Sequence, residues 1–361
     1  MKKNSVRIGI IGCGWATNIK HIPSLNKIPE AEVVALCDHN LKKAEDTAKK
    51  YCGEVKLYTD YHEMLKDETI DAIHVCTQNK YHCKITCDAL NAGKHVLCEK
   101  PMAITDEEAE LMVKTAEKTG KKLTVGYQSR FSNEAIYLKN EADKGTFGEI
   151  YYARAIALRR KAVPTWGDFL DKQIQGGGPI IDIGSHSLDL ALWIMNNYEP
   201  DFCVGTTYRK LISDGGVGNA FGSWDPKKFT SEDSGFGFVK MKNGATISVE
   251  ASWALNILDP KESCVQICGT EAGADTLING ARINGIRDGK LFSQIPDFRN
   301  IGASLYRDEH MSSPVEREAH SWIFSILEDT DPVVKPAEAA VVTKVLDGIY
   351  KSAESGTIYK F

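Results

Sequence analysis

The sequence predicts an α/β protein with a doubly wound parallel sheet in its N-terminal part. A C-terminal α/β domain with an open, mostly antiparallel sheet is expected to follow. Three observations predict this fold. Apolar runs alternate with amphipathic stretches early in the chain, and a glycine-rich turn follows the first run. After Glu149 the apolar runs are longer and follow one another along the chain. The length of 361 residues suits about two domains. We therefore expect one domain at residues 1–130 and a second at residues 131–361.

Five short apolar runs in the first domain are typical of buried parallel strands. They are Ile8–Ile11, Val33–Cys37, Ala72–Cys76, His95–Cys98 and Leu123–Gly126. Helices are expected between them because parallel strands need crossover connections. These helices are Leu41–Tyr51, a short helix capped by Asp60, Tyr81–Ala92 ending at Gly93, and Thr105–Thr119 ending at Gly120.

The second domain carries longer runs that stand next to each other, which indicates antiparallel pairing. They are Ile150–Leu158, Phe202–Leu211, Phe236–Met241, Ala245–Trp253 and Cys264–Cys268. Residues 242–244 read Lys-Asn-Gly and predict a hairpin turn. Helices are expected at about Ile180–Asn196, Val315–Leu327 and Ala337–Ser355. The long polar segment Ser213–Gly235 is either a functional loop or a surface excursion.

Composition excludes several classes of protein. The net charge of −5 and the absence of a basic stripe disfavour nucleic-acid binding. No apolar stretch is long enough to span a bilayer, so no membrane association is expected. The ten cysteines include no C-x-x-C pair, and no metal site is predicted. Many unpaired thiols suit a reducing compartment, so a cytoplasmic location is expected.

The turn after the first run has the features of a dinucleotide-binding unit. Gly12 allows a tight turn, Gly14 lets the backbone approach a pyrophosphate, and the following helix supplies amide donors. The third glycine of this fingerprint would fall at Thr17, so the match is incomplete. Trp15 and Ala16 complete the expected cofactor contacts of the turn.

Asp38 ends the second strand, 21 residues after Thr17. A carboxylate at this place accepts hydrogen bonds from an adenosine ribose and repels a 2′-phosphate. NAD is therefore expected rather than NADP.

Two further motifs follow later strands, at the edge where open α/β sheets bind ligands. Thr77, Asn79 and His82 follow one strand, and Glu99 and Lys100 follow the next. Pro101 restricts the backbone of Lys100, which argues against a merely flexible loop lysine.

A third motif lies in the second domain, where three glycines at residues 176–178 precede a predicted helix. Asp182 and His186 are four residues apart and share one helix face, with Asp189 on it too. A histidine beside a carboxylate is either an oriented general base or a buried structural pair.

Taken together, these motifs resemble the glucose–fructose oxidoreductase, inositol dehydrogenase and MocA (Gfo/Idh/MocA) family. The glycine turn, Thr77-x-Asn79-x-x-His82, Glu99-Lys100-Pro101 and Asp182-x-Gly184-x-His186 carry the resemblance over nearly the whole chain. It implies a Rossmann domain that binds NAD and a second domain for substrate binding and oligomerisation. It also implies that Lys100 and His186 share proton removal while Asp182 holds the substrate or orients His186, and that Gln128 lies near the nicotinamide.

The expected reaction is hydride transfer from a ring secondary hydroxyl, possibly at C3, of a sugar or glycoside to NAD. Arg154, Arg160 and Trp166 are expected to bind the substrate, although solvated arginines on an edge strand are the alternative. The segment around Trp166 is similar to bacterial sugar and glycoside 3-dehydrogenases. A homo-oligomer, dimer or tetramer, is expected, and NAD kept bound between turnovers is one mode considered.

Three alternative functions remain open from the sequence: an inositol dehydrogenase, an NAD-dependent glycosidase that works by oxidation and elimination, and a non-catalytic sensor of NAD and sugar. The presence of Lys100, Asp182 and His186 together argues against the sensor. Which of Lys100 and His186 accepts the proton is also left open.

Overall fold

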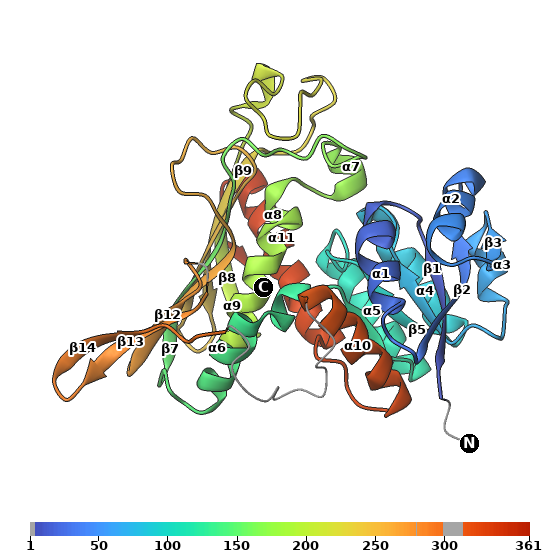
Figure 1. The fold of residues 1–361 in the computed structure, drawn as a ribbon. Coiled ribbons are helices and arrows are strands. Elements are labelled where there is room, and N and C mark those ends of the chain that lie inside the picture. The colour runs from blue at the N-terminus through green and yellow to red at the C-terminus, as the bar shows by residue number, and fades with distance from the viewer. Residues whose placement is uncertain (1–3, 279, 299–312) are drawn as a thin grey trace. The chain divides into compact units, whose positions relative to one another are not determined.

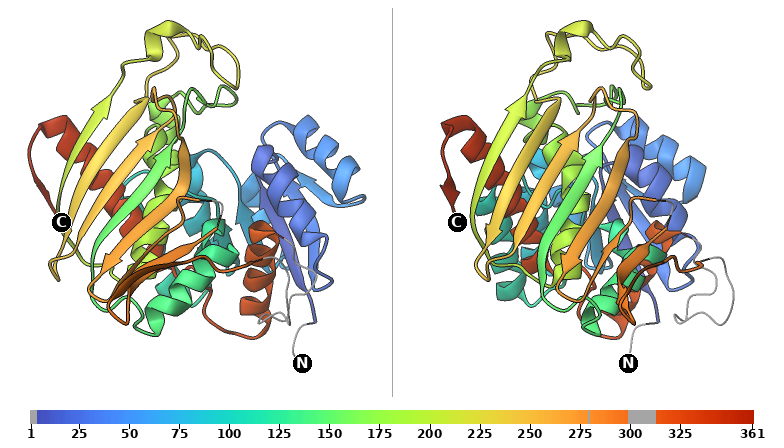
Figure 2. Two further views of the ribbon diagram at one scale, coloured as in Figure 1. Left: turned by 60° about the vertical axis from the view of Figure 1, so that its left-hand side comes forward. Right: turned by 90° about the vertical axis from the view of Figure 1, so that its left-hand side faces the viewer.

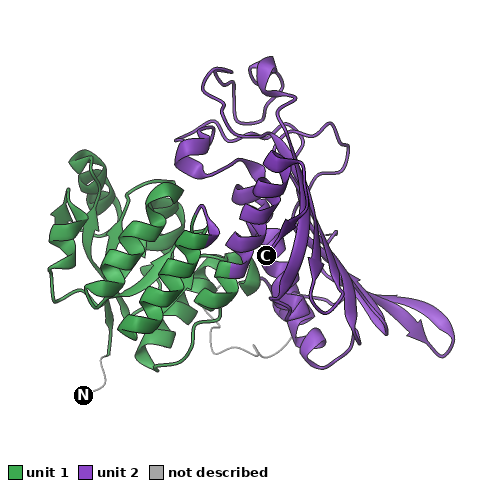
Figure 3. Ribbon diagram, turned by 180° about the vertical axis from the view of Figure 1, so that it is seen from behind, with its two compact units in different colours: residues 1–103, 107–131, 304–340 green, residues 104–106, 132–303, 341–361 purple. Residues whose placement is uncertain are grey.

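The computed structural model of the chain describes residues 4–278, 280–298 and 313–361 (Figure 1). They form two compact units, coloured separately in Figure 3. Unit 1 comprises residues 1–103, 107–131 and 304–340, and unit 2 comprises residues 104–106, 132–303 and 341–361.

Unit 1 is built on a six-stranded parallel sheet with strand order β3-β2-β1-β4-β5-β6. Its strands are β1 (Val6–Ile11), β2 (Ala31–Cys37), β3 (Lys56–Tyr58), β4 (Ala72–Val75), β5 (His95–Cys98) and β6 (Leu123–Val125). The order reverses between β1 and β4, which is the place where doubly wound sheets bind nucleotides. The predicted parallel sheet is confirmed, with the short strand β3 as an addition. Its one exposed and two half-buried residues make too short an apolar run to be recognised.

Helices connect these strands. They are α1 (Ile22–Leu25), α2 (Leu41–Tyr51), α3 (Tyr61–Leu65), α4 (His82–Asn91) and α5 (Asp106–Thr119). The predicted Asp60 cap of α3 is confirmed, and Gly93 and Gly120 follow α4 and α5 with φ of +78° and +65°, as expected. The sequence predicts a helix after the glycine turn but not the bounds of α1, and α2 is capped by the side-chain oxygen of Asn40.

Helix α10 (Pro314–Leu327) belongs to unit 1, whereas the sequence places all of residues 131–361 in the second domain. The physical reason is burial of its apolar face. Trp322 and Ile323 of α10 lie in the same core cluster as Ile22 and Leu25. Burial of such side chains contributes roughly 1.5–3 kcal/mol each. A return of the chain to a distant core leaves no local signal in the sequence.

Unit 2 contains a nine-stranded sheet with order β14-β13-β12-β11-β7-β10-β9-β8-β15. The strands are β7 (Ile150–Leu158), β8 (Pro200–Tyr208), β9 (Ser234–Met241), β10 (Thr246–Ser252), β11 (Lys261–Gly269), β12 (Ala272–Asp275), β13 (Arg282–Arg287), β14 (Lys290–Gln294) and β15 (Tyr359–Lys360). All pairs are antiparallel except β7 with β10. The open, mostly antiparallel sheet is confirmed, as is the β9–β10 hairpin through Gly244 at φ +93°.

The helices of unit 2 cover one face of this sheet, and the other face carries no described helix (Figure 2). The helices are α6 (Asn133–Asp143), α7 (Lys172–Gln175), α8 (Pro179–Asp182), α9 (Gly184–Met195) and α11 (Pro336–Ser355), the last of which begins in unit 1. Helix α9 packs on β7, where Ala153, Ala155 and Ala157 are fully buried. Small side chains at alternate positions let the helix approach the sheet closely.

The helix predicted at Ile180–Asn196 is divided in two at Ile183, between α8 and α9. A side chain at Gly184 would stand 3.1 Å from the Cβ atom of Ala251 on β10, so the chain passes close to the sheet here. Asp182 therefore ends one short helix, and His186 lies in the first turn of the next.

Candidate functional site

The glycine turn has the geometry that a pyrophosphate needs. Gly12 has φ of +96°, and a Cβ atom there would lie 2.5 Å from the carbonyl oxygen of Cys76. Only glycine fits that position. At Gly14 a Cβ atom would meet nothing within 4 Å, so the backbone borders open space at the start of a helix. These features fit a dinucleotide whose phosphates approach the backbone amides.

Thr17, at the place of the missing third glycine, is completely buried. Its hydroxyl donates a hydrogen bond to the carbonyl oxygen of Gly12. Residues Thr17–His21 form a short π-helix that continues directly into α1. The wider π turn accommodates a side chain where the usual fingerprint has none.

Asp38 lies at the end of β2 and is 8% exposed. Its Oδ2 accepts the backbone N–H of Cys13 at 2.9 Å, and its Oδ1 accepts that of Asn40 at 2.9 Å. The carboxylate is thereby held beside the glycine turn. Each oxygen keeps a lone pair for a ribose hydroxyl. This arrangement fits the expected choice of NAD over NADP.

Asp38→Asn is expected to raise the KM for NAD about 10-fold or more, because a hydrogen bond to a charged acceptor contributes roughly 1.5–3 kcal/mol. It should also raise kcat/KM with NADP, since the repulsion of the 2′-phosphate is removed. Steady-state kinetics with both cofactors measure this. Asp46→Asn, an exposed carboxylate on α2 paired with Lys42, is the control. An unaltered NAD to NADP ratio in Asp38→Asn would contradict the assignment.

The segments after β4 and β5 are joined by His82. This histidine is fully buried, with Nδ1 2.8 Å from the carbonyl oxygen of Pro101 and Nε2 3.1 Å from that of Thr77. Burial lowers its pKa, so the imidazole is neutral and donates to one of the two carbonyls. Such a placement favours a positioning role over direct contact with a cofactor. Thr77, Asn79, Lys100 and Gln128 are all half-buried at the same sheet edge.

A network of buried charged residues contacts the backbone of Lys100. Glu99 Oε1 lies 2.6 Å from Lys20 Nζ and 2.8 Å from His21 Nε2, and its Oε2 accepts the backbone N–H of Lys100 at 3.1 Å. Lys20 also contacts Glu318 at 2.9 Å and Gln128 at 3.1 Å. Burial alone would raise the pKa of Glu99, but the Lys20 ammonium and the His21 hydrogen bond hold it well below its usual range. The network fixes the backbone of Lys100 through an ionised Glu99.

Sequence reasoning misses Lys20, His21 and Glu318 in this network. The available signal is the pair Lys20-His21 on a helix that must bury one face against the sheet. Glu318 lies on α10, nearly 300 residues after Lys20 in the sequence, so no local sequence pattern predicts their contact.

The buried histidines predict acid instability. Burial lowers the pKa values of His21, His74 and His95, the last to about 4. In the unfolded chain these histidines bind protons below about pH 6.5, whereas in the folded protein they stay neutral to lower pH. The free energy of unfolding therefore decreases as the pH falls from about 6.5 towards 4. For His95→Asn we expect a flatter slope of unfolding free energy against pH, by up to about 1.4 kcal/mol per pH unit.

Urea unfolding between pH 7.5 and 4.5 measures this slope. Asparagine at residue 95 keeps an acceptor for the backbone N–H of Lys122, which His95 Nδ1 accepts at 3.0 Å. His62→Asn, an exposed histidine on α3, is the control and should keep the wild-type slope. Equal slopes for the wild type and His95→Asn would refute the prediction.

In unit 2, Asp182 and His186 are 9% and 8% exposed. Asp182 Oδ2 accepts the indole N–H of Trp253 at 3.0 Å, and Trp253 is fully buried. The Asp182 carboxylate is therefore fixed by the residue that directly follows β10. Asp182 ends α8 and His186 lies in the first turn of α9, so the prediction that they share one face of a single helix is wrong.

The three preceding glycines are closely packed rather than mobile. Gly178 donates its N–H to both oxygens of Glu232 at 2.9 Å, and Tyr350 O–H donates to Glu232 at 2.7 Å. A Cβ atom on Gly177 would lie 2.1 Å from the Tyr350 hydroxyl, and one on Gly178 would lie 2.2 Å from the Glu232 carbonyl oxygen. Burial raises the pKa of Glu232. Sequence reasoning misses Glu232, Tyr350 and Trp253, which come from distant segments.

The three predicted substrate residues lie on β7 and in the loop that follows it. Arg154 lies on the face of the sheet opposite the buried alanines under α9, and it pairs with Glu250 at 2.9 Å and Gln266 at 3.3 Å. Strand β7 lies between β10 and β11 inside the sheet, so the edge-strand alternative is wrong, and Arg154 is a half-buried, ion-paired side chain. Arg160 is exposed in the bend after β7, and Trp166 is 42% exposed in the loop that follows.

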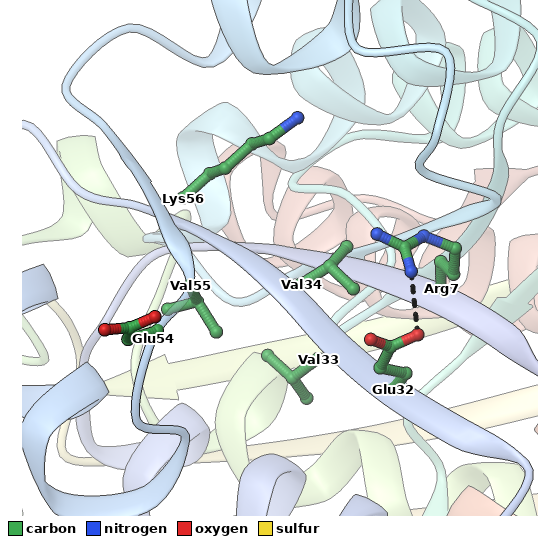
Figure 4. A pocket seen from close by; sticks show the side chains of 7 residues that line it. All are labelled: Arg7, Glu32, Val33, Val34, Glu54, Val55 and Lys56. Carbon is green, nitrogen blue, oxygen red and sulfur yellow. Dashed lines mark hydrogen bonds and ion pairs between the residues drawn. The ribbon is translucent and has the colours of Figure 1, made fainter.

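A surface pocket lies at the other edge of the unit 1 sheet (Figure 4). It is lined by Arg7, Glu32, Val33, Val34, Glu54, Val55 and Lys56. Arg7 and Glu32, which form an ion pair at 2.9 Å, stand at the amino ends of β1 and β2. The glycine turn is at the carboxyl end, so this pocket is separate from the candidate cofactor site.

The described residues hold no group of three or more His, Cys, Asp or Glu arranged for a metal ion. A membrane-crossing helix, which needs both length and apolar character, is likewise not found among them.

Known proteins resemble the chain along its whole length. Residues 6–127 match the oxidoreductase family with an NAD-binding Rossmann fold, and residues 136–275 match the GFO/IDH/MocA C-terminal domain. The chain is 34% identical over 357 residues to D-glucoside 3-dehydrogenase of Escherichia coli strain K12, covering 99% of this chain and 98% of that protein. It is 30% identical to myo-inositol 2-dehydrogenase of Thermotoga maritima over 59% of each chain. A solved structure of levoglucosan dehydrogenase with NADH shares the fold, with a TM-score of 0.81 at 19% identity over 99% of each chain.

Proposed function

Because the chain belongs to the Gfo/Idh/MocA family of NAD-dependent oxidoreductases, we propose that it oxidises a ring secondary hydroxyl of a sugar or glycoside, at C3. The observation that carries the proposal is the presence in unit 1 of Lys100 at the same carboxyl edge of the sheet as the glycine turn, and of Asp182 with His186 in unit 2. Similarity over the full chain to a D-glucoside 3-dehydrogenase supports the substrate class and the carbon.

Unit 1 is proposed to bind NAD and unit 2 to bind the sugar. Gly12, Gly14, Trp15 and Ala16 would hold the pyrophosphate and Asp38 the ribose. Thr77, Asn79 and Gln128 would border the nicotinamide, with His82 and Glu99 positioning the loops around it. NAD supplies the hydride acceptor when it is bound.

The proton of the reacting hydroxyl must leave as the carbon–hydrogen bond breaks. We propose that Lys100 stabilises the developing alkoxide and that His186 accepts the proton, with Asp182 orienting the substrate or His186. Trp253 holds Asp182 through its indole N–H, so the carboxylate does not depend on solvent for its position. The reverse assignment, in which Lys100 takes the proton, is distinguished by comparing the pH–rate profiles of variants at Lys100 and His186.

The test is a substrate screen on the full chain. Glucose, methyl and phenyl glucosides, myo-inositol and levoglucosan are each supplied with NAD, and reduced nicotinamide is read by its absorbance. We expect turnover with glucosides and a 3-oxo product by mass spectrometry. Turnover with myo-inositol alone would favour the inositol alternative, release of free sugar from a glycoside would favour oxidation and elimination, and NAD and sugar binding without reduction would favour a sensor.

Assembly and location are also proposed. The helix-free face of the unit 2 sheet exposes Val204, Tyr208 and Phe238 by 40–46%, and a homo-oligomer, dimer or tetramer, would cover it. Light scattering measures the mass. All ten cysteines are described and free of disulfides, which supports a reducing, cytoplasmic location.

A further inference from the structure

The long segment between β8 and β9 is tied to the loop that follows β7. Ala220 donates its N–H to the carbonyl oxygen of Lys161 at 2.9 Å. Asn219 accepts the N–H of Val163 at 2.8 Å and donates to its carbonyl oxygen at 3.0 Å. Lys161 forms an ion pair with Asp214. Two segments about 55 residues apart thus form one ordered surface in unit 2.

Three aromatic rings gather on this surface, and we call Trp166, Phe169 and Phe221 the aromatic cluster. The Trp166 ring lies 5.0 Å from that of Phe221 and 5.8 Å from that of Phe169, both edge to face. Trp166 and Phe221 remain 42% and 44% exposed. Hydrogen bonds of the two loops hold these rings partly open to solvent, although large aromatic side chains are normally buried in a core or at an interface.

The same segment also reaches the Asp182 site. Trp224 packs on Phe229 at 5.6 Å, and Phe229 packs on Trp253 at 6.2 Å. Trp253 donates to Asp182, and Glu232 at the end of the segment holds the N–H of Gly178 just before α8. The segment that presents Phe221 therefore also fixes the backbone and the carboxylate of the Asp182 motif.

We propose that the aromatic cluster is the subsite for a second ring, carried at C1 of the glycoside whose first ring is oxidised. The inference rests on the proposed function. A glycoside carries such a group by definition, and an aryl ring or the apolar face of a pyranose fits against exposed indole and phenyl rings. Asp168 lies between Trp166 and Phe169 in the chain, and its exposed side chain suits the hydroxyl groups of a sugar ring.

The experiment compares phenyl and methyl glucosides of the same anomeric configuration with the wild-type protein and Phe221→Ala, in the presence of NAD. The ratio of kcat/KM for phenyl over methyl glucoside is expected to fall about 3- to 10-fold in Phe221→Ala, as the loss of one aromatic contact predicts. Phe221→Tyr should restore most of the ratio. Phe292→Ala, a half-buried phenylalanine on β14, is the matched control and should keep it.

Each outcome of this comparison supports or overturns the proposed subsite. If the wild type oxidises neither glucoside, the proposed function and the subsite both fail. If it oxidises both and Phe221→Ala keeps the wild-type ratio, the subsite alone is overturned. If that variant keeps the ratio but lowers the oligomer mass in light scattering, the aromatic cluster is an interface between copies of the chain and the subsite is again overturned.

Discussion

Lys100→Met is expected to lower kcat for the sugar by about 10²- to 10⁴-fold, the range for losing a charged group that acts on the proton and the developing alkoxide. Methionine keeps an unbranched side chain of similar length and removes only the charge. The backbone N–H of Lys100 still reaches Glu99, so the loop should keep its position. Stopped-flow absorbance of reduced nicotinamide measures the rate of the chemical step.

Two further measurements separate chemistry from folding in this variant. NADH binding, followed by its fluorescence, and the urea midpoint should stay near wild-type values. Lys118→Met, an exposed lysine on α5, is the matched control and should turn over normally. Wild-type kcat in Lys100→Met would exclude Lys100 from the reaction.

His186→Asn is expected to lower kcat by about 10²-fold or more and to remove the acidic limb of the pH–rate profile. In the wild type, kcat/KM is expected to fall towards acidic pH, because only a neutral imidazole accepts a proton. The variant should lose this fall. Its residual activity should increase at higher pH, where hydroxide can take the proton.

The Lys100→Met/His186→Asn double variant tests whether the two residues act as a unit. If they serve one proton transfer, the double variant loses little more than the worse single variant. His62→Asn again serves as an exposed-histidine control. A pH profile with its acidic limb intact in His186→Asn, but absent in Lys100→Met, would assign the proton acceptor to Lys100 instead.

Local signals accounted for most of the fold. Short β-branched runs, capping residues such as Asp60 and glycines such as Gly120 are read from neighbours a few residues away, because they act through backbone conformation and period. The strands from β12 to β14 were missed because their residues are mostly exposed or small. The interruption at Ile183 was missed because close packing of Gly184 on Ala251, rather than helix propensity, divides that helix.

The sequence by itself determined the parallel sheet, the glycine turn with Asp38, and the motifs that carry Lys100, Asp182 and His186. Each of these depends on residue types at fixed local spacing. Only the tertiary structure decided which residues hold these motifs in place. Lys20 and His21 bind Glu99, and Trp253 donates a hydrogen bond to Asp182. Glu232, which is held by Tyr350, binds the glycine segment before α8. Buried polar groups must find partners when water is removed, and chain folding supplies those partners from segments that no local pattern connects.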